Sequence, residues 1–210
     1  MANDQLQIES TQDLRQWLAA NHATAGSIWL IRYRKTAGDR HVSWSELVDE
    51  LLCYGWVDSL PRKLDAERTM IRISPRNPKS NWSGINKEKI KRLREEGRMT
   101  PAGEALVEQA KANGCWTFLD DVEQLIVPPD LEAALTTTDK AALYYDRFPD
   151  SGKRAILEWI KSAKTTTTRE KRIRQTAEKA ARNVKANHPK GRDAGPKHAQ
   201  GDDESPATDA

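Results

Sequence analysis

Residues 56–74 read WVDSLPRKLDAERTMIRIS, and this stretch decides the fold. Two runs that contain β-branched and aromatic residues, Trp56–Leu64 and Arg68–Ser74, have the composition of β-strands. Only the segment Asp65–Glu67 separates them, and so short a link joins antiparallel neighbours. The stretch therefore predicts a β-hairpin whose two outer ends lie at the same edge of the sheet.

Elements on the N-terminal side of the hairpin complete a small sheet with helices around it. The segment Ser27–Lys35 (SIWLIRYRK) is aromatic and β-branched, which predicts a third strand. Ser10 with Asp13, and Ser43 with Glu46, have the spacing of capping boxes at helix N-termini. We therefore predict an α+β fold, with a small antiparallel sheet of about three strands and flanking helices.

The C-terminal half has the periodicity of helices. Three polar residues that can begin a helix precede its apolar stripes: Asp130, Thr138 and Ser151. The helix after Ser151 has apolar residues at positions i, i+3, i+4 and i+7, namely Ile156, Trp159, Ile160 and Ala163. A stripe of this kind must pack against other apolar groups, so we expect Trp159 in a core.

Composition divides the chain into three parts. Residues 1–127 form the predicted α+β core, and residues 128–187 form a helical region that we expect to pack on or beside it. Residues 188–210 consist largely of Gly, Pro, Ala and charged residues and contain no large apolar side chain. Because no apolar burial can offset the entropy of ordering this tail, we expect it to be disordered.

The net charge of +3 hides two basic zones. Residues 62–98 hold 12 basic and five acidic residues, and residues 151–192 hold 13 basic and three acidic residues. Basic zones of this kind favour anionic partners, so the sequence points to an anionic small molecule or a nucleic acid, with an acidic protein as a further class of partner.

The sequence gives no sign of a membrane span, a signal peptide or a metal site. No window approaches the roughly 18 apolar residues of a spanning helix, and Met1–Ser10 lacks the basic start and apolar run of a signal peptide. A cytoplasmic protein is expected. Cys53 and Cys115 lie in apolar settings, each without a second ligand at metal-binding spacing. We predict no metal and no cofactor.

Four blocks of the chain carry a family resemblance. They are residues 52–59 (LCYGWVDS), 74–83 (SPRNPKSNWS), 97–103 (GRMTPAG) and 157–173. In order and spacing they resemble the YdeI/OmpD-associated family, also described as bacteriocin-protection or OmdA-like proteins, over roughly residues 10–185. The resemblance implies a role in stress resistance, against bacteriocins or antimicrobial peptides.

The loop after the hairpin is the candidate ligand site. It combines cations, hydroxyls and an aromatic residue just before a helix, a setting that suits phosphate or another oxyanion. The hairpin brings it beside the turn that contains Asp58. The predicted anion-binding residues are Asp58, Ser59, Arg62, Arg72, Arg76, Lys79, Ser80 and Trp82. The alternative is structural: the arginines pair with Asp58, Asp65 and Glu67 across the hairpin, and Trp82 belongs to the core.

A second candidate surface is the basic helix near the C-terminus. Its cations include Lys161, Lys164, Arg169 and Arg172. An amphipathic basic helix can bind nucleic acid, an acidic membrane surface or an acidic protein, and it can equally be a solvated face that keeps the chain soluble.

These features favour a non-enzymatic binding protein for a phosphate-bearing or polyanionic ligand, and we predict no catalytic residue. Asp58 and Ser59 are adjacent on a strand and point to opposite faces, so they do not form a base and nucleophile pair. Two alternatives remain open. One is an enzyme for a small phosphorylated or carboxylated substrate, with Arg72, Arg76 and Lys79 holding the anion and Asp58 as acid or base; the other is a protein–protein adaptor.

Overall fold

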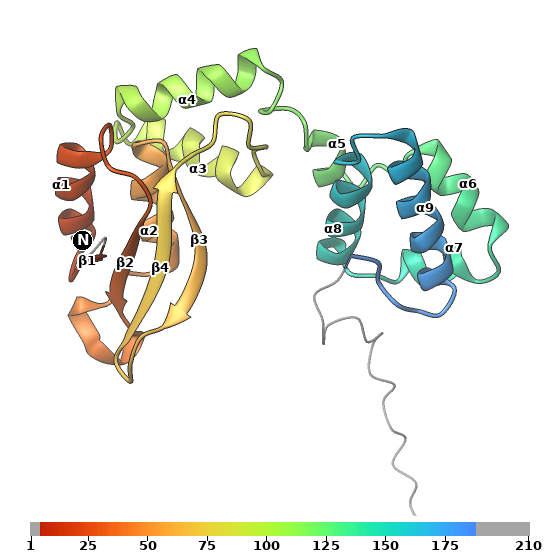
Figure 1. Ribbon diagram of the computed structural model, residues 1–210, viewed down its shortest axis with the longest axis horizontal. Helices are drawn as coiled ribbons and strands as arrows, with labels where there is room; N and C mark the ends of the chain where they lie inside the picture. The colour runs from red at the N-terminus through yellow and green to blue at the C-terminus, as the bar shows by residue number, and fades with distance from the viewer. Residues whose placement is uncertain (1–4, 188–210) are drawn as a thin grey trace, which may run out of the picture. The chain divides into compact units, whose positions relative to one another are not determined.

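The computed structural model describes residues 5–187 and divides the chain into two compact units, Met1–Asp120 and Asp121–Ala210 (Figure 1). The boundary predicted from the sequence lies after residue 127. The tail predicted to be disordered, residues 188–210, lies outside the described residues. The two units are described separately below.

A four-stranded mixed sheet forms the centre of the N-terminal unit. Its strand order is β1 (Gln5–Gln7), β2 (Ile28–Tyr33), β4 (Arg68–Pro75) and β3 (Trp56–Lys63). The three predicted strands are antiparallel neighbours, and β1 adds a parallel fourth strand next to β2. The predicted α+β class is confirmed. The strand β1 escaped prediction because three residues, Gln-Leu-Gln, are too few to show a periodic pattern.

The two strands of the hairpin are antiparallel, and its outer ends share one edge, as predicted. Trp56 pairs with Pro75 at that edge, and Lys63 pairs with Thr69 near the turn. Beyond the strands, the Arg76 N–H donates to the Gly55 carbonyl at 2.9 Å. The register shifts between Asp58 and Pro61, so β3 contains a bulge.

Helices and sheet share one hydrophobic core. The helices of this unit are α1 (Thr11–Asn21), α2 (Trp44–Cys53), α3 (Gly84–Glu95) and α4 (Pro101–Ala112), with a short 3₁₀ segment η1 (Lys35–Arg40) after β2. Alternate strand residues such as Leu30, Ile71 and Ile73 are buried in one cluster with Leu14 of α1 and Leu51 of α2. Both capping boxes are confirmed, at the starts of α1 and α2.

The second half of the chain is helical, as predicted. It contains α5 (Asp120–Glu123), α6 (Pro129–Thr137), α7 (Ala141–Asp146), α8 (Asp150–Lys161) and α9 (Thr166–Ala180), and α9 contacts α6, α7 and α8. Pro128 and Pro149 occupy the N-cap positions of α6 and α8. These two helices therefore begin one residue before the predicted starts, Asp130 and Ser151. Helix α7 begins three residues after its predicted start, Thr138.

One expectation about the core of this half was wrong. Ile156 and Ile160 are buried, but Trp159 is partly exposed. The narrow stripe of α8 turns its aliphatic residues inward and leaves the indole at its margin. Across the described residues, the helices are all too short or too polar to cross a bilayer.

Candidate functional site

Part of the predicted anion site assembles into a cleft at the open end of the hairpin. Asp58 from β3, Arg76 and Ser80 from the following loop, and Asn86 from the first turn of α3 line a cleft of about 240 Å³. Its other wall is apolar and comes from α2 and the start of β3. The apolar lining residues are Val48, Leu51, Leu52, Trp56 and Val57.

Arg76 is the most deeply buried cation of this cleft. Its side chain is 8% exposed, and its guanidinium lies 3.9 Å from the centre of the Trp82 ring. One terminal nitrogen donates to the Asn81 carbonyl at 2.6 Å, while Nε is buried without a hydrogen-bond partner. Burial lowers the pKa of Arg76, because the charged form is poorly solvated there.

Asp58 is the acidic group of the same cleft, and burial raises the pKa of its carboxyl. Among residues 5–187, neither Asp58 nor Arg76 takes part in an ion pair, and neither one perturbs the pKa of the other. The cleft thus holds one acid and one base that do not neutralise each other.

The other predicted residues lie elsewhere. The Ser59 hydroxyl donates to the Arg72 carbonyl at 3.2 Å, and Arg72 donates from Nε to the Ser27 hydroxyl at 2.5 Å. Lys79 is exposed. Trp82 is 2% exposed and belongs to the core, which is the structural interpretation of that residue.

The other half of that structural interpretation, the pairing of the arginines across the hairpin, is seen for Asp65 alone. Within the described residues, Asp65 pairs with Arg68 inside the hairpin turn, at 2.7 Å, while Arg72 and Arg76 pair with none of the three carboxylates. These two arginines instead donate to a hydroxyl and a carbonyl, so none of the three carboxylates offsets their charge.

A second pocket, about 260 Å³, lies where the closed end of the hairpin meets the end of β2 and the start of α2. Four cations line it: Arg32, Arg34, Arg62 and Lys63. The remaining lining residues are Trp44, Pro61, Thr69, Met70 and Ile71, so the lining contains no carboxylate. We call this the basic pocket.

The cations of the basic pocket have few partners for their charge. The Arg32 guanidinium donates to the Val42 carbonyl at 2.6 Å and lies 5.5 Å from the Trp44 ring. Burial lowers the pKa of Arg32, with no acidic neighbour to oppose the effect. The Nε of Arg34 is buried without a hydrogen-bond partner. In the part of the chain that the structure describes, none of the four cations forms an ion pair with a carboxylate.

Local chain geometry explains how these cations meet. The Arg34 N–H donates to the Glu67 carbonyl at 2.8 Å, which ties the end of β2 to the hairpin turn. The capping box at Ser43 begins α2 at Trp44, whose side chain is 40% exposed at the pocket. Arg62 pairs with Met70, which places its side chain on the face of the sheet that carries Trp29, and its guanidinium lies 4.6 Å from that ring. Arg32 and Lys63 both pair with Thr69 and share the other face.

Sequence reasoning selected only Arg62 from this pocket. Arg32 and Arg34 lie in a predicted strand, and their alternation in the run IRYRK is a polar pattern within that hydrophobic strand. That alternation was the available signal. The approach of α2 to the hairpin could not be inferred from it.

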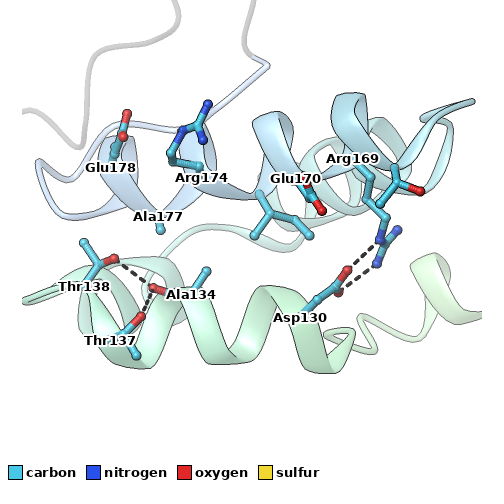
Figure 2. Close-up of a pocket in the computed structure, with 11 residues that line it drawn as sticks. Asp130, Ala134, Thr137, Thr138, Arg169, Glu170, Arg174, Ala177 and Glu178 are labelled. Atoms are coloured by element: carbon cyan, nitrogen blue, oxygen red, sulfur yellow. Dashed lines mark hydrogen bonds and ion pairs between the residues drawn. The ribbon is translucent and has the colours of Figure 1, made fainter.

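The cations of the predicted basic helix are largely engaged within the C-terminal unit. Arg169 donates two hydrogen bonds to Asp130, at 2.6 and 2.8 Å, across a groove of about 540 Å³ between α6 and α9 (Figure 2). Lys161 pairs with Asp121 at 2.5 Å. Arg172 donates to the Trp159 carbonyl and to the Ser162 hydroxyl, and its guanidinium lies 5.1 Å from the Trp159 ring. Lys164 is exposed.

Histidine and cysteine contribute little to either pocket. His22 and His41 each contact a backbone carbonyl through Nδ1 at 2.9 Å. Cys53 is buried as expected, while Cys115 is partly exposed. Among residues 5–187, no three histidine, cysteine or acidic side chains are grouped so that they could hold a metal ion.

Comparison with known families assigns the two halves of the chain separately. Residues 124–183 match the family described as Bacteriocin-protection, YdeI or OmpD-Associated, which confirms the predicted family for this part of the chain. Residues 6–106 match a domain of unknown function, DUF8412, and this match contains three of the four blocks that carried the resemblance. No curated protein and no solved structure matches the chain.

Proposed function

We propose that this protein, whose residues 124–183 are of the YdeI/OmpD-associated type, binds a phosphate-bearing ligand in the basic pocket of its N-terminal unit. The observation that carries the proposal is a concave site lined by four cations and no carboxylate. Uncompensated cations that share a pocket repel one another, and an anion with several oxygens relieves that repulsion and accepts hydrogen bonds from the guanidinium groups.

The lining of the basic pocket favours binding over catalysis. It contains no histidine, cysteine, aspartate or glutamate, so no side chain there can exchange a proton readily near neutral pH. The enzymatic alternative relied on Arg72, Arg76 and Lys79 acting together with Asp58. Of these residues, only Arg76 and Asp58 line the same cleft.

Trp44 adds a preference for ligands that carry a flat group beside the phosphate. Its ring is 40% exposed at the pocket and is flanked by the Arg32 guanidinium. Aromatic rings at basic sites stack on the bases of nucleotides and of single-stranded nucleic acids. By extension from the family description, we place this binding in the setting of bacteriocin protection.

Isothermal titration calorimetry with pyrophosphate, ATP and an eight-residue oligothymidylate tests the proposal. We expect saturable binding of at least one of them to the wild type. Lys63→Gln should weaken that binding about tenfold, since one charge-assisted hydrogen bond is worth roughly 1.5 kcal/mol or more. Lys91→Gln removes an equal charge from an exposed site on α3 and should leave the affinity unchanged.

The three probes distinguish the sources of phosphate. Strong, salt-dependent binding of the oligonucleotide alone indicates a polyanion ligand, whereas binding of ATP or pyrophosphate indicates a small molecule. The proposal fails if none of the three binds, or if Lys63→Gln and Lys91→Gln weaken binding equally.

A further inference from the structure

We propose that the cleft between α2 and the open end of the hairpin is a second binding site, which accepts a zwitterionic amino acid with an aliphatic side chain. The cleft shares no lining residue with the basic pocket, so this inference does not rest on the proposed function.

The first step of the argument is the pair of opposite charges. Asp58 and Arg76 border the same small cleft, yet among the described residues each is without an ionic partner. A buried charge without a counter-charge costs free energy, and a ligand that supplies the counter-charge offsets this cost. Two such charges of opposite sign call for a ligand that carries both signs.

The second step is the orphaned donor. Arg76 is more than nine-tenths buried, is held on one side by the Trp82 ring and donates to the Asn81 carbonyl. Its Nε–H remains buried without an acceptor. A guanidinium fixed in this way is preorganised for a planar carboxylate, because its orientation is already set by packing.

The third step excludes ligands of a single charge. A phosphate or simple carboxylate that contacts Arg76 leaves the Asp58 carboxylate unpaired beside a second negative group. A simple amine that contacts Asp58 leaves Arg76 unpaired beside a second positive group. An α-amino acid presents its carboxylate to Arg76 and its ammonium to Asp58, so both charges are met.

The fourth step concerns the apolar wall and the size of the cleft. Val48, Leu51 and Leu52 from α2, together with Trp56, line the same cleft as the charged groups. Ser80 and Asn86 supply further hydrogen-bonding groups at its polar side. A volume of about 240 Å³ is small for a ligand site, which favours a single amino acid over a larger molecule.

The test is calorimetric titration of the full chain with L-leucine and L-valine, and with the two half-ligands of leucine. The half-ligands are 4-methylpentanoate, which lacks the amino group, and 3-methylbutylamine, which lacks the carboxylate. We expect saturable binding of at least one amino acid, and at least about tenfold weaker binding of both half-ligands, since each loses one charge-assisted contact.

Asp58→Asn is the decisive variant because it removes the charge and keeps the shape. It should weaken amino-acid binding about tenfold or more and should not weaken the binding of 4-methylpentanoate. Glu67→Gln, which removes a charge from the exposed hairpin turn, is the matched control and should leave both affinities unchanged. Arg76→Lys keeps the positive charge but loses the planar set of guanidinium donors. It should weaken amino-acid binding even if it also lowers stability.

Three results would overturn the inference. They are the absence of saturable binding of both amino acids, equal binding of leucine and 4-methylpentanoate by the wild type, and unchanged leucine affinity in a folded Asp58→Asn variant.

Discussion

In the C-terminal unit, Arg169 donates two hydrogen bonds to Asp130 and Lys161 pairs with Asp121, whereas in the N-terminal unit four cations line a pocket that contains no carboxylate. By composition alone the C-terminal helices are the more basic region, since residues 151–192 hold 13 basic and three acidic residues. The difference shows that a count of charges does not locate a binding site. Charges that already have partners gain less from a ligand, so the pairing of each charge has to be known as well.

The largest expected effect on the free energy of unfolding concerns two tryptophans, one in each unit, that each lie next to an arginine. Arg76 lies on the buried Trp82, and Arg172 lies over the partly exposed Trp159. Trp82→Ala should lower the free energy of unfolding by about 3–5 kcal/mol, the usual cost of removing a large buried side chain. Trp159→Ala should cost roughly 1–2 kcal/mol, because little cavity remains at a partly exposed position.

Urea denaturation followed by far-UV circular dichroism measures both losses. Equal losses for the two variants would show that Trp159 is as important to its core as Trp82 is, and would support the prediction from the sequence that Trp159 lies in a core.

A smaller effect is expected from the ion pair of the C-terminal unit. Asp130→Ala should lower the free energy of unfolding by about 1 kcal/mol or less, because both side chains are partly exposed. The bonds from Arg169 lower the pKa of Asp130, so this stabilisation is present above the carboxyl's ordinary value of 3.8. It should disappear as the pH falls below that value, through the lowered pKa of the folded protein.

Thermal denaturation of the wild type and Asp130→Ala, from pH 7 down to pH 2, tests this prediction. A difference that grows on acidification would contradict the sign of the linkage.

The smallest effect should have the opposite sign. Lys63→Gln removes one of four like charges from the basic pocket and should raise stability by a few tenths of a kcal/mol at low ionic strength. The gain should vanish in about 1 M salt, where the screening length is only about 3 Å. A loss of stability at low salt would indicate that Lys63 has a favourable partner and that the cations of the pocket repel one another less than its lining implies.

The sequence was sufficient for the hairpin and for the placement of Asp58 and Arg76 at its open end. A link as short as Asp65–Glu67 allows one arrangement of two strands, and that arrangement brings Asp58 and Arg76 to one edge. The capping boxes at Ser10 and Ser43 were equally local, since each is made by residues three apart.

The basic pocket, and the ion pairs of the cations in the C-terminal unit, could not be predicted from local spacing. The pocket requires the start of α2 to approach the hairpin, a tertiary contact that no local spacing encodes. The same is true of Arg169 and Asp130, which are 39 residues apart in the chain. Charge pairing over such distances depends on helix packing, so the surplus of basic residues in the C-terminal helices does not tell which of them are paired.

The most direct test of the central claim is a nuclear magnetic resonance titration of the isotope-labelled full chain with pyrophosphate. We expect saturable shifts of the backbone amides of residues 32–34, 44, 62 and 63, with residues 161–172 unaffected. Shifts concentrated on residues 161–172, with the basic pocket unchanged, would contradict it.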